Sequence, residues 1–552
     1  MAGFETLKAS AANILLDRPI RSAGFAALAL GALAACGFQP LGLWPLTILA
    51  LAGLLEIAVR MPSRRKVFLI GWLFGVGHFS VGNNWIAAAF THQSELPLWL
   101  GPIAVVLIAF YLALFPALAA CCAWQFVRSV QKPAQNDASA RWFGLAFAGF
   151  WIITEWLRSW VLTGYAWNPL GIALLGPFDA QGLAFAAPWI GTYGLSGLLV
   201  LISAFLRRLI HAGLDALPGR RLALAGGGSA CAAVIAAFML FPAHYLEKRE
   251  GARPFTLVQP GLTQDRIGDS RYYEANFQKL AALTSPPVPH TRRIVFWPES
   301  GLADHLREGY PRYLYRIMNY AADPQAARER IGRVIGPESL VLTGAVDLVI
   351  KDGQAVAARN VVTALDADGH LLANYAKAHL VPFGEYVPLR DALEPLGLRR
   401  FVAGSLDFWP GPGPRSYDFG VWGKAGVQIC YEIVFSGQVV DRNSRPEYIF
   451  NPSNDGWFGS WGPPQHLAQA RLRAIEEGLP VLRSTTSGIS AVIDANGIVR
   501  QSIARYREGR LDGAIPPPKR ATLFARYGNF LPLALAGVFL LICAVALRRS
   551  DG

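Results

Sequence analysis

The chain has 552 residues, of which 53% are hydrophobic and only 16% are charged, and its mean hydropathy is +0.31. Charged residues make up about 25% of a typical soluble protein, so this composition excludes an ordinary soluble enzyme and indicates a membrane protein. The net charge of +13 could also indicate nucleic-acid binding. The positions of the basic residues make that the weaker explanation, because many of them lie in loops between the apolar runs.

Long uncharged runs fill the first part of the chain. A helix needs about 20 apolar residues to cross a hydrocarbon core of roughly 30 Å. Eight runs are candidates, at residues 22–37, 44–60, 67–90, 98–127, 142–162, 192–210, 222–242 and 529–547. We therefore predict a membrane domain of about seven helices over residues 1–245, a polar domain over 250–520 and a C-terminal transmembrane helix over 529–547.

Basic residues fall in alternate loops between these runs. They are Arg18, Arg21, Arg60, Arg64, Arg65, Lys66, Arg128, Lys132, Arg141, Arg207, Arg208, Arg220, Arg221, Arg548 and Arg549. The other loops, such as "FQPLGLWP", carry almost no Lys or Arg. By the positive-inside rule the basic side is cytoplasmic, so both termini are predicted in the cytoplasm and the 250–520 domain outside it. Much of the net charge belongs to these loops, and we expect no nucleic-acid partner.

From residue 255 onward, short β-rich runs such as "FTLVQPG", "RRIVFWPES" and "SLVLTGAVDLVI" alternate with helix-compatible segments such as "GPPQHLAQARLRAIEEG". This pattern predicts an α/β sandwich. No glycine-rich phosphate loop opens a helix, and His379 and His466 are isolated histidines that we expect to form hydrogen bonds. We therefore predict no cofactor and no metal.

Cys430 is the one cysteine predicted outside the membrane spans. The other five are Cys36, Cys121, Cys122, Cys231 and Cys543. The 250–520 domain thus has no second cysteine for an internal disulfide. The Cys430 thiol must be free, capped or catalytic.

Three strand ends present reactive side chains: Glu299 in "IVFWPES", Lys377 and Glu385 in "YAKAHLVPFGEYVP", and Cys430 in "GVQICYEIVF". Residues just past strand ends converge on one crevice in an α/β sheet. A thiol needs a base or a nearby cation to become a nucleophile. Glu299 supplies the base, and Lys377 supplies a cation for the oxyanion formed during attack on a carbonyl.

Each of these residues also has an ordinary structural explanation. A lone cysteine is usually a small buried apolar residue, a glutamate after proline often complements a helix start, and a lysine is usually solvated. Their joint occurrence favours an acyl-transfer triad of Glu299, Lys377 and Cys430.

The blocks "WPES", "KAHLVPFGEYVP" and "CYEIVF" resemble the Glu, Lys and Cys blocks of the nitrilase (carbon-nitrogen hydrolase) superfamily. Together with "NPSNDGWFG", "GPPQHLAQARLRAIEEGLPVLRST" and the membrane-side "EWLRSWVLTGYAWNPLG", they resemble the apolipoprotein N-acyltransferase family over nearly the whole chain. The resemblance implies a multi-span α-helical membrane domain joined to a nitrilase-like α-β-β-α sandwich, in the bacterial inner membrane with the sandwich in the periplasm.

The resemblance also implies a reaction. A phospholipid, typically phosphatidylethanolamine, donates an acyl chain to Cys430, and the thioester passes it to the α-amino group of a diacylglyceryl-cysteine on an apolipoprotein. The cycle is ping-pong, and the enzyme is expected to act as a monomer among membrane lipids.

Supporting residues follow from the same resemblance. Glu385 matches a glutamate that orients the lysine, while Tyr431 and Glu432 match residues important for activity. The alternatives are a buried salt bridge for Glu385, a packed ring for Tyr431 and a strand-end carboxylate for Glu432.

Other residues have weaker signals. Glu155 and Arg158 share a face of one predicted span and either line a lipid cleft or neutralise each other. Trp457 and Phe458 either form a lid or pack as ordinary aromatic residues. The segment near Gly268 lacks a tryptophan common in the family, and Ser487 replaces a common asparagine.

Three other functions compete with the transferase. A membrane-anchored amidase or nitrilase-like hydrolase would use water as the acceptor. A non-enzymatic receptor would bind lipoproteins without needing the Cys430 thiol. A transporter would need more paired ionisable residues within the spans than this sequence provides.

Overall fold

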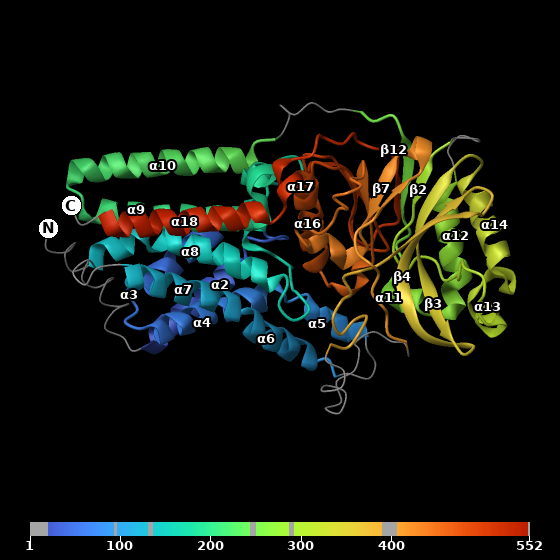
Figure 1. Cartoon of the computed structure of the whole chain (residues 1–552), viewed down its shortest axis with the longest axis horizontal. Coiled ribbons are helices and arrows are strands. Elements are labelled where there is room, and N and C mark those ends of the chain that lie inside the picture. The colour runs from blue at the N-terminus through green and yellow to red at the C-terminus, as the bar shows by residue number, and fades with distance from the viewer. Residues whose placement is uncertain are drawn as a thin grey trace.

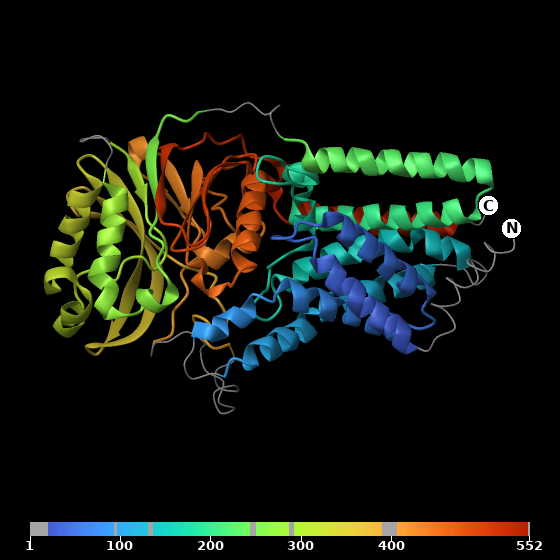
Figure 2. The same cartoon turned by 180° about the vertical axis from the view of Figure 1, so that it is seen from behind.

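The computed structural model describes residues 20–92, 97–130, 136–242, 250–285, 292–388 and 406–549. A bundle of long helices occupies one end of the molecule, and two β-sheets with their covering helices occupy the other (Figures 1 and 2). After its last strand, β12 (Gly509–Ala514), which belongs to the first sheet, the chain returns to the bundle through α17 (Leu523–Tyr527) and α18 (Phe530–Arg549).

Helices occupy all eight predicted spans. They are α2 (Ile20–Ala35), α3 (Trp44–Arg60), α4 (Arg64–Gly82), α6 (Leu100–Leu112), α7 (Leu114–Val130), α8 (Asn136–Arg158), α9 (Ala187–Asp215), α10 (Pro218–Leu240) and α18. The run predicted as one span over 98–127 forms two helices, α6 and α7. Pro116 explains the break, because it has no N–H to bond the carbonyl of Leu112 and its ring crowds that carbonyl.

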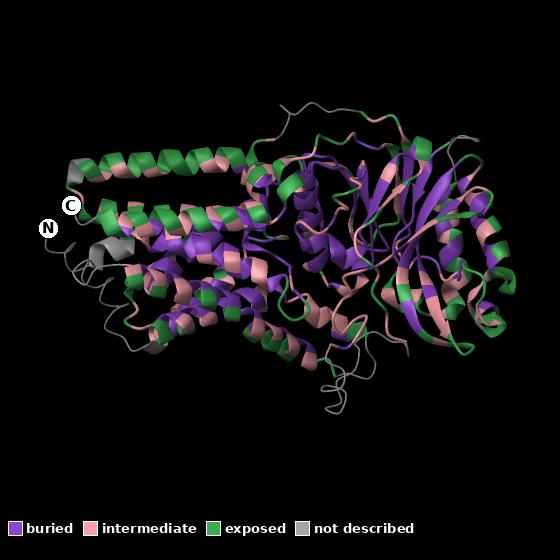
Figure 3. Ribbon diagram, viewed as in Figure 1, coloured by how far each residue is buried: buried purple, intermediate pink, exposed green. Residues whose placement is uncertain are grey.

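By length and apolar composition, four helical stretches among the described residues are able to cross a membrane: Leu100–Val130, Leu183–Asp215, Arg220–Leu240 and Phe530–Arg549. The helices α2 and α3 are shorter, with 16 and 17 residues. Helix α10 stands apart from its neighbours with most of its surface exposed (Figure 3). Its exposed residues are mainly apolar, as expected of a helix that contacts lipid.

Parts of the topology prediction fall outside the described residues. Arg18 and Lys132 are among the residues not described, as are residues 1–19 and 243–249 at the limits of the predicted membrane domain. Two short helices, α5 (Ile86–Ala89) and η1 (Phe90–His92), follow α4 on the side of the bundle that faces the sheets (Figure 1).

The first sheet has the strand order β12-β1-β2-β3-β4-β5 and the second β11-β10-β9-β8-β7-β6. The strands are β1 (Pro254–Gln259), β2 (Ile294–Phe296), β3 (Leu340–Lys351), β4 (Gln354–Asp366), β5 (Leu371–Ala376), β6 (Ser416–Asp418), β7 (Lys424–Val427), β8 (Tyr448–Ser453), β9 (Val481–Thr485), β10 (Ser490–Ile493), β11 (Val499–Ile503) and β12 (Gly509–Ala514). Strands β1, β2 and β3 pair in parallel, as do β7, β8 and β9.

The central strands are apolar on both faces, so one face of each sheet packs against the other sheet and the opposite face packs against helices. Phe296 of β2 contacts the rings of Tyr448 and Phe450 in the opposite sheet, at centroid distances of 6.1 and 4.9 Å. Val295, which points the other way, packs with residues of α12 (Tyr273–Thr284) and α14 (Pro324–Ile335). With α16 (Gly462–Glu477) covering the second sheet, the domain is the α-β-β-α sandwich that the sequence predicted.

Helix α16 lies between the second sheet and the membrane helices, and nearly all of it is buried (Figures 1 and 3). Its apolar residues Leu467, Ala470 and Ala474 join the core of the sandwich. Several of its other residues face the membrane domain, where Gln465 Nε2 donates to the carbonyl of Gly82 at 3.1 Å. The helix therefore joins the two parts of the molecule.

Two buried arginines of α16 complete this junction. The Arg471 guanidinium donates to the carbonyls of Gly176, Pro177 and Ala180 at 2.6 to 2.9 Å, and its Nε donates to Gly497 at 2.8 Å. Two residues later, Arg473 forms an ion pair with Glu476 at 2.8 Å and donates to Thr192 of α9.

Glu476 also accepts hydrogen bonds from both the backbone N–H and the hydroxyl of Thr192, each at 2.6 Å. Thr192 directly follows Gly191, whose φ of +65° interrupts α9. A glycine suits this conformation. Because the helix is interrupted there, the Thr192 N–H is free to bond Glu476 instead of a carbonyl within α9.

We predict that Arg471→Met destabilises the protein by at least about 3 kcal/mol, because the three buried carbonyls of Gly176, Ala180 and Gly497 lose their donor and each unpaired group costs about 1–3 kcal/mol. Thermal unfolding in detergent measures the change. Arg271→Met is the control, because Arg271 pairs with Asp269 at an exposed position where an ion pair contributes about 0–1 kcal/mol. Equal stability of the two variants would contradict the role assigned to Arg471.

Candidate active site

The three residues predicted to carry the chemistry lie where strands of both sheets end. Glu299 follows β2, Lys377 follows β5, and Cys430 is the first residue of the 3-10 helix η8 (Cys430–Val434), which begins shortly after β7. Lys377 Nζ lies 3.7 Å from Glu299 Oε1. All three side chains are buried, and the charges of Glu299 and Lys377 both act on the Cys430 thiol. The structure thus brings the predicted triad together.

The carboxylate of Glu299 is held by two hydrogen bonds. Its Oε1 accepts from Asn360 Nδ2 at 2.6 Å, and its Oε2 accepts from the backbone N–H of Asn454 at 2.7 Å. Asn360 lies on β4 of the first sheet and Asn454 follows β8 of the second. The proposed base is therefore fixed by both halves of the sandwich.

Lys377 is paired with a second carboxylate. Its Nζ donates to Glu385 Oε1 at 2.9 Å, and the same oxygen accepts from Asn360 at 3.0 Å. The other oxygen of Glu385 accepts from the backbone N–H of Val381 at 2.8 Å. Burial acts to lower the pKa of Lys377, but the carboxylates of Glu385 and Glu299 outweigh it and raise that pKa above its ordinary value. Lys377 is thus a permanent cation in the site.

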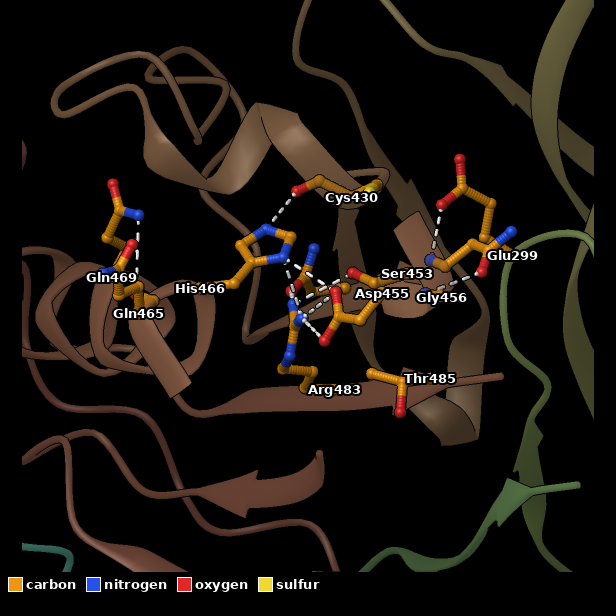
Figure 4. Close-up of polar contacts among 12 residues, drawn as sticks. Glu299, Cys430, Ser453, Asp455, Gly456, Gln465, His466, Gln469, Arg483 and Thr485 are labelled. Atoms are coloured by element: carbon orange, nitrogen blue, oxygen red, sulfur yellow. Dashed lines mark hydrogen bonds and ion pairs between the residues drawn. The ribbon is translucent and has the colours of Figure 1, made fainter. Parts of the chain in front are cut away.

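Cys430 has an unusual backbone conformation, with φ at +51°. A residue with a Cβ is strained in this left-handed region. Figure 4 shows its carbonyl facing His466 while its sulfur points toward the side where Glu299 lies. Burial raises the pKa of the Cys430 thiol, and Glu299 adds to the effect against the opposing charge of Lys377. The resting thiol is therefore protonated at neutral pH, so its proton has to leave as the sulfur attacks.

The Glu432 carboxyl ties the nucleophile helix to the loop that follows Lys377. It accepts hydrogen bonds from the Tyr375 hydroxyl at 2.8 Å and from the backbone N–H groups of Ala378 and Ile429 at 2.7 Å each. Burial raises the pKa of Glu432 to about 7 against these hydrogen bonds. Glu432 thus fixes Lys377 and Cys430 relative to each other.

Tyr431 points toward the membrane domain. Its hydroxyl donates to the carbonyl of Gly164 at 3.4 Å, and its ring packs against Trp167 and Phe435 at centroid distances of 6.5 and 5.1 Å. Gly164 and Trp167 belong to the segment that follows α8. The residue next to Cys430 therefore contacts the membrane domain directly.

Glu155 and Arg158 pair within α8 at 3.8 Å. Glu155 accepts from the backbone N–H of Leu170 at 2.8 Å, and Arg158 donates to the carbonyl of Trp167 at 2.9 Å. Phe458 is buried beside Trp167, at a centroid distance of 5.5 Å. These contacts organise the same segment after α8.

Several residues that shape the site have no sequence signal of their own. Asn360 bridges Glu299 and Glu385, yet it reads only as one polar residue at the start of the apolar run "NVVTAL". The backbone N–H of Asn454 has no side-chain signature. Behind Cys430, the side chains of Asp455, His466 and Arg483 form a buried network (Figure 4). His466 is hydrogen-bonded there, as the sequence predicted.

Outside the site, three ligand-type side chains lie close together in the described residues: Asp366, Asp368 and His370. They belong to the turn between β4 and β5. Asp366 accepts from the backbone N–H groups of Asp368 and His370 at 3.0 and 2.8 Å, so the turn itself accounts for their proximity.

Comparisons with known proteins agree with this architecture. Residues 270–521 match the carbon-nitrogen hydrolase family model, and residues 30–205 match the model of the apolipoprotein N-acyltransferase N-terminal domain. A solved amidase from Nesterenkonia sp. aligns with 49% of this chain and 92% of its own, at 18% identity and a TM-score of 0.32. The fold and the two family-model matches define a carbon-nitrogen hydrolase domain carried by a membrane protein.

Full-length relatives narrow this class. The chain is 34% identical to the apolipoprotein N-acyltransferase of Bradyrhizobium diazoefficiens, over 99% of both chains. It is 33% identical to that of Rhodopseudomonas palustris, over 95% of both chains. The chain belongs to the apolipoprotein N-acyltransferase family.

We predict that Glu299→Gln separates thiol ionisation from catalysis. Removing the negative charge of Glu299 lowers the raised pKa of Cys430, so the thiolate fraction at pH 8 increases. Alkylation of Cys430 by iodoacetamide is then at least as fast as in the wild type, while acyl transfer falls about 10²–10⁴-fold through loss of the base. Mass spectrometry of the alkylated protein across pH 6–10 compares the alkylation rates of the two proteins at each pH. Slower alkylation in the variant at every pH would contradict this electrostatic account.

We further predict that Asn360→Ala lowers acyl transfer about 10–100-fold, the range seen when a residue that orients catalytic groups is lost. Both Glu299 and Glu385 lose a hydrogen-bond donor in this variant. Asn374→Ala is the control, because Asn374 on the neighbouring strand donates to Asp347 and touches none of the triad. The comparison is made on initial rates at equal amounts of folded protein, and similar rates in the two variants would remove Asn360 from the site.

Proposed function

We propose that the chain transfers an acyl chain from a membrane phospholipid, through a thioester on Cys430, to the α-amino group of the N-terminal diacylglyceryl-cysteine of apolipoproteins. The observation that carries the proposal is the buried Glu299–Lys377–Cys430 arrangement in a carbon-nitrogen hydrolase domain that packs on membrane helices. Membership in the family assigns lipoprotein N-acylation. The positions of Glu299, Lys377 and Cys430 support a route through two half-reactions.

The first half-reaction forms the thioester. The Cys430 sulfur attacks the ester carbonyl of the donor while its proton passes to Glu299. Lys377 Nζ stabilises the negative charge on the carbonyl oxygen. When the carbon–oxygen bond breaks, Glu299 returns the proton to the leaving alkoxide. A lysophospholipid departs, and the acyl group stays on sulfur.

The second half-reaction forms the amide. The neutral α-amino group of the acceptor attacks the thioester carbonyl, and Glu299 accepts a proton from the nitrogen. Collapse of the intermediate breaks the carbon–sulfur bond, and Glu299 gives the proton to the sulfur. The reaction uses no cofactor, because the acyl group remains activated as a thioester until the amine attacks it.

The location follows from the same proposal. Residues 1–245 and 529–547 would anchor the chain in the bacterial inner membrane with both termini cytoplasmic, and residues 250–520 would work in the periplasm. Exposed tryptophans support the position of the bilayer surface, because Trp99, Trp160 and Trp189 stand at the ends of α6, α8 and α9 that face the sandwich and tryptophan favours the interface. A donor that diffuses in the bilayer, such as phosphatidylethanolamine, would reach the site by lateral movement in the membrane. The enzyme would act as a monomer.

Incubation with phosphatidylethanolamine alone tests the first half-reaction. We expect mass spectrometry to show Cys430 carrying one acyl group that hydroxylamine removes, together with one equivalent of lysophospholipid. Addition of a synthetic diacylated lipopeptide should then discharge the acyl group to the peptide amine. Cys430→Ser is the control, and it should form no hydroxylamine-sensitive adduct and no triacylated product.

The product distribution decides against the competing functions. Discharge of the acyl group only as free fatty acid would identify a hydrolase and overturn the transferase. Full lipoprotein N-acylation by Cys430→Ser would overturn the thioester.

A further inference from the structure

A buried polar network lies directly behind the nucleophile, on the side opposite Glu299 (Figure 4). His466 of α16 places Nε2 at 3.0 Å from the carbonyl oxygen of Cys430 and Nδ1 at 2.9 Å from Asp455 Oδ1. Arg483 of β9 reaches both oxygens of Asp455 with Nη2 at 2.8 Å and lies 3.0 Å from His466 Nδ1. His466, Asp455 and Arg483 are each at most 1% exposed.

The partners of His466 assign its tautomer. A carbonyl oxygen only accepts, so Nε2 must carry the hydrogen and donate to Cys430. Burial and the Arg483 guanidinium lower the pKa of His466 against the effect of Asp455, so the ring is neutral at neutral pH. Nδ1 faces the Asp455 carboxylate and the Arg483 guanidinium. The imidazole cannot take the Cys430 proton, because Nε2 already carries a hydrogen that bonds the Cys430 carbonyl and Nδ1 is occupied by these two partners.

Asp455 and Arg483 form the rigid support of the ring. Burial alone would raise the pKa of Asp455, but the Arg483 guanidinium outweighs it, and that pKa is lowered to about 2. Arg483 Nη1 also donates to Ser453 Oγ at 2.9 Å. A Cβ at Gly488 would lie 2.2 Å from Asp455 Oδ2, so the chain leaves room for this carboxylate only because residue 488 is glycine.

The same network connects to the base. Asp455 directly follows Asn454, whose backbone N–H holds Glu299 Oε2 at 2.7 Å. Asn454 is fixed in turn, because its Oδ1 accepts from the Thr486 hydroxyl at 2.9 Å. The buried segment Asn454–Asp455 thus anchors both groups. The Asn454 N–H holds the Glu299 carboxylate, and the Asp455 side chain holds the His466 ring, which bonds the Cys430 carbonyl.

The Cys430 backbone needs such an anchor. Its left-handed φ costs about 1–3 kcal/mol for a residue with a side chain, and such a conformation persists only where surrounding contacts impose it. The hydrogen bond from His466 holds the carbonyl on one side, which leaves the sulfur on the side of Glu299 and Lys377.

We propose that His466, held by Asp455 and Arg483, is a positioning residue that fixes the strained Cys430 backbone and so aims its thiol at Glu299 and the acyl donor. The residue acts on the first half-reaction of the proposed function, and it touches neither the substrate nor the reacting sulfur. A displacement of about 1 Å in a reacting group can cost about 10² in rate.

The test compares His466→Phe with His466→Gln. The Phe variant keeps a planar ring but has no donor, and the Gln variant carries an N–H at a similar distance from its backbone. We expect His466→Phe to form the acyl adduct on Cys430 about 10²-fold more slowly, with an unchanged KM for phosphatidylethanolamine. His466→Gln should recover most of that rate, to within about 10-fold of the wild type.

Iodoacetamide alkylation supplies a readout that does not depend on acyl transfer. Release of the carbonyl frees the buried thiol, so alkylation of Cys430 should be faster in His466→Phe than in the wild type, while acylation is slower. His305→Phe is the matched control, because His305 is also buried and places Nδ1 at 3.2 Å from a backbone carbonyl, that of Val346, while no described contact joins it to Cys430. It should change neither rate by more than about 3-fold.

Two results would overturn the proposal. One is an acylation rate in His466→Phe within about 3-fold of the wild type. The other is an equal loss in His466→Phe and His466→Gln at the same melting temperature, which would assign the effect to ring shape. If the wild type formed no acyl adduct, the proposed function would fail, while the alkylation contrast would still decide whether His466 positions the thiol.

Discussion

The buried polar face of α16 is the constraint on which the active site depends. Charged groups cannot be removed from water without partners, so Arg471, Arg473 and Glu476 require the carbonyls and the Thr192 N–H that the membrane domain presents. The two parts of the chain can therefore pack in few relative positions. Because His466 lies on the same helix and bonds to Cys430, the contact that fixes the domains also fixes the nucleophile relative to the membrane.

Much of the fold could be predicted from the sequence. Apolar runs and strongly buried strands are local patterns, so the helices of the bundle and strands such as β1, β2 and β3 follow from the sequence. The strands β5, β6, β11 and β12 were missed because they are the edge strands of the two sheets and are mostly exposed or half-buried, so burial imposes no regular apolar pattern on them. Their pairing partners are far away in the chain. The break between α6 and α7 was also missed, although Pro116 marks it.

The site divides in the same way. Glu299, Lys377 and Cys430 are recognisable because their chemistry is complementary and each follows a strand. Asn360, the Asn454 N–H and the Asp455–His466–Arg483 network became visible only when the two sheets and α16 were in place. Their partners are 61 to 155 residues away for the contacts to Glu299, and no local pattern encodes such a contact. Glu432 lies two residues from the nucleophile, yet its hydrogen bonds to the loop after Lys377 span 53 to 54 residues.

The charge balance of the site explains how a thiol can serve without histidine as its base. Two carboxylates, Glu299 and Glu385, surround the one ammonium of Lys377, so the site is net negative and opposes a thiolate. A protonated thiol resists reaction until a carbonyl is bound beside it, because only then can the charge that leaves Glu299 reappear on an oxyanion near Lys377. Once the acyl group occupies the sulfur, Glu299 is again an anionic acceptor, which suits deprotonation of an attacking amine. The same excess of negative charge therefore suppresses the free nucleophile and serves the second half-reaction.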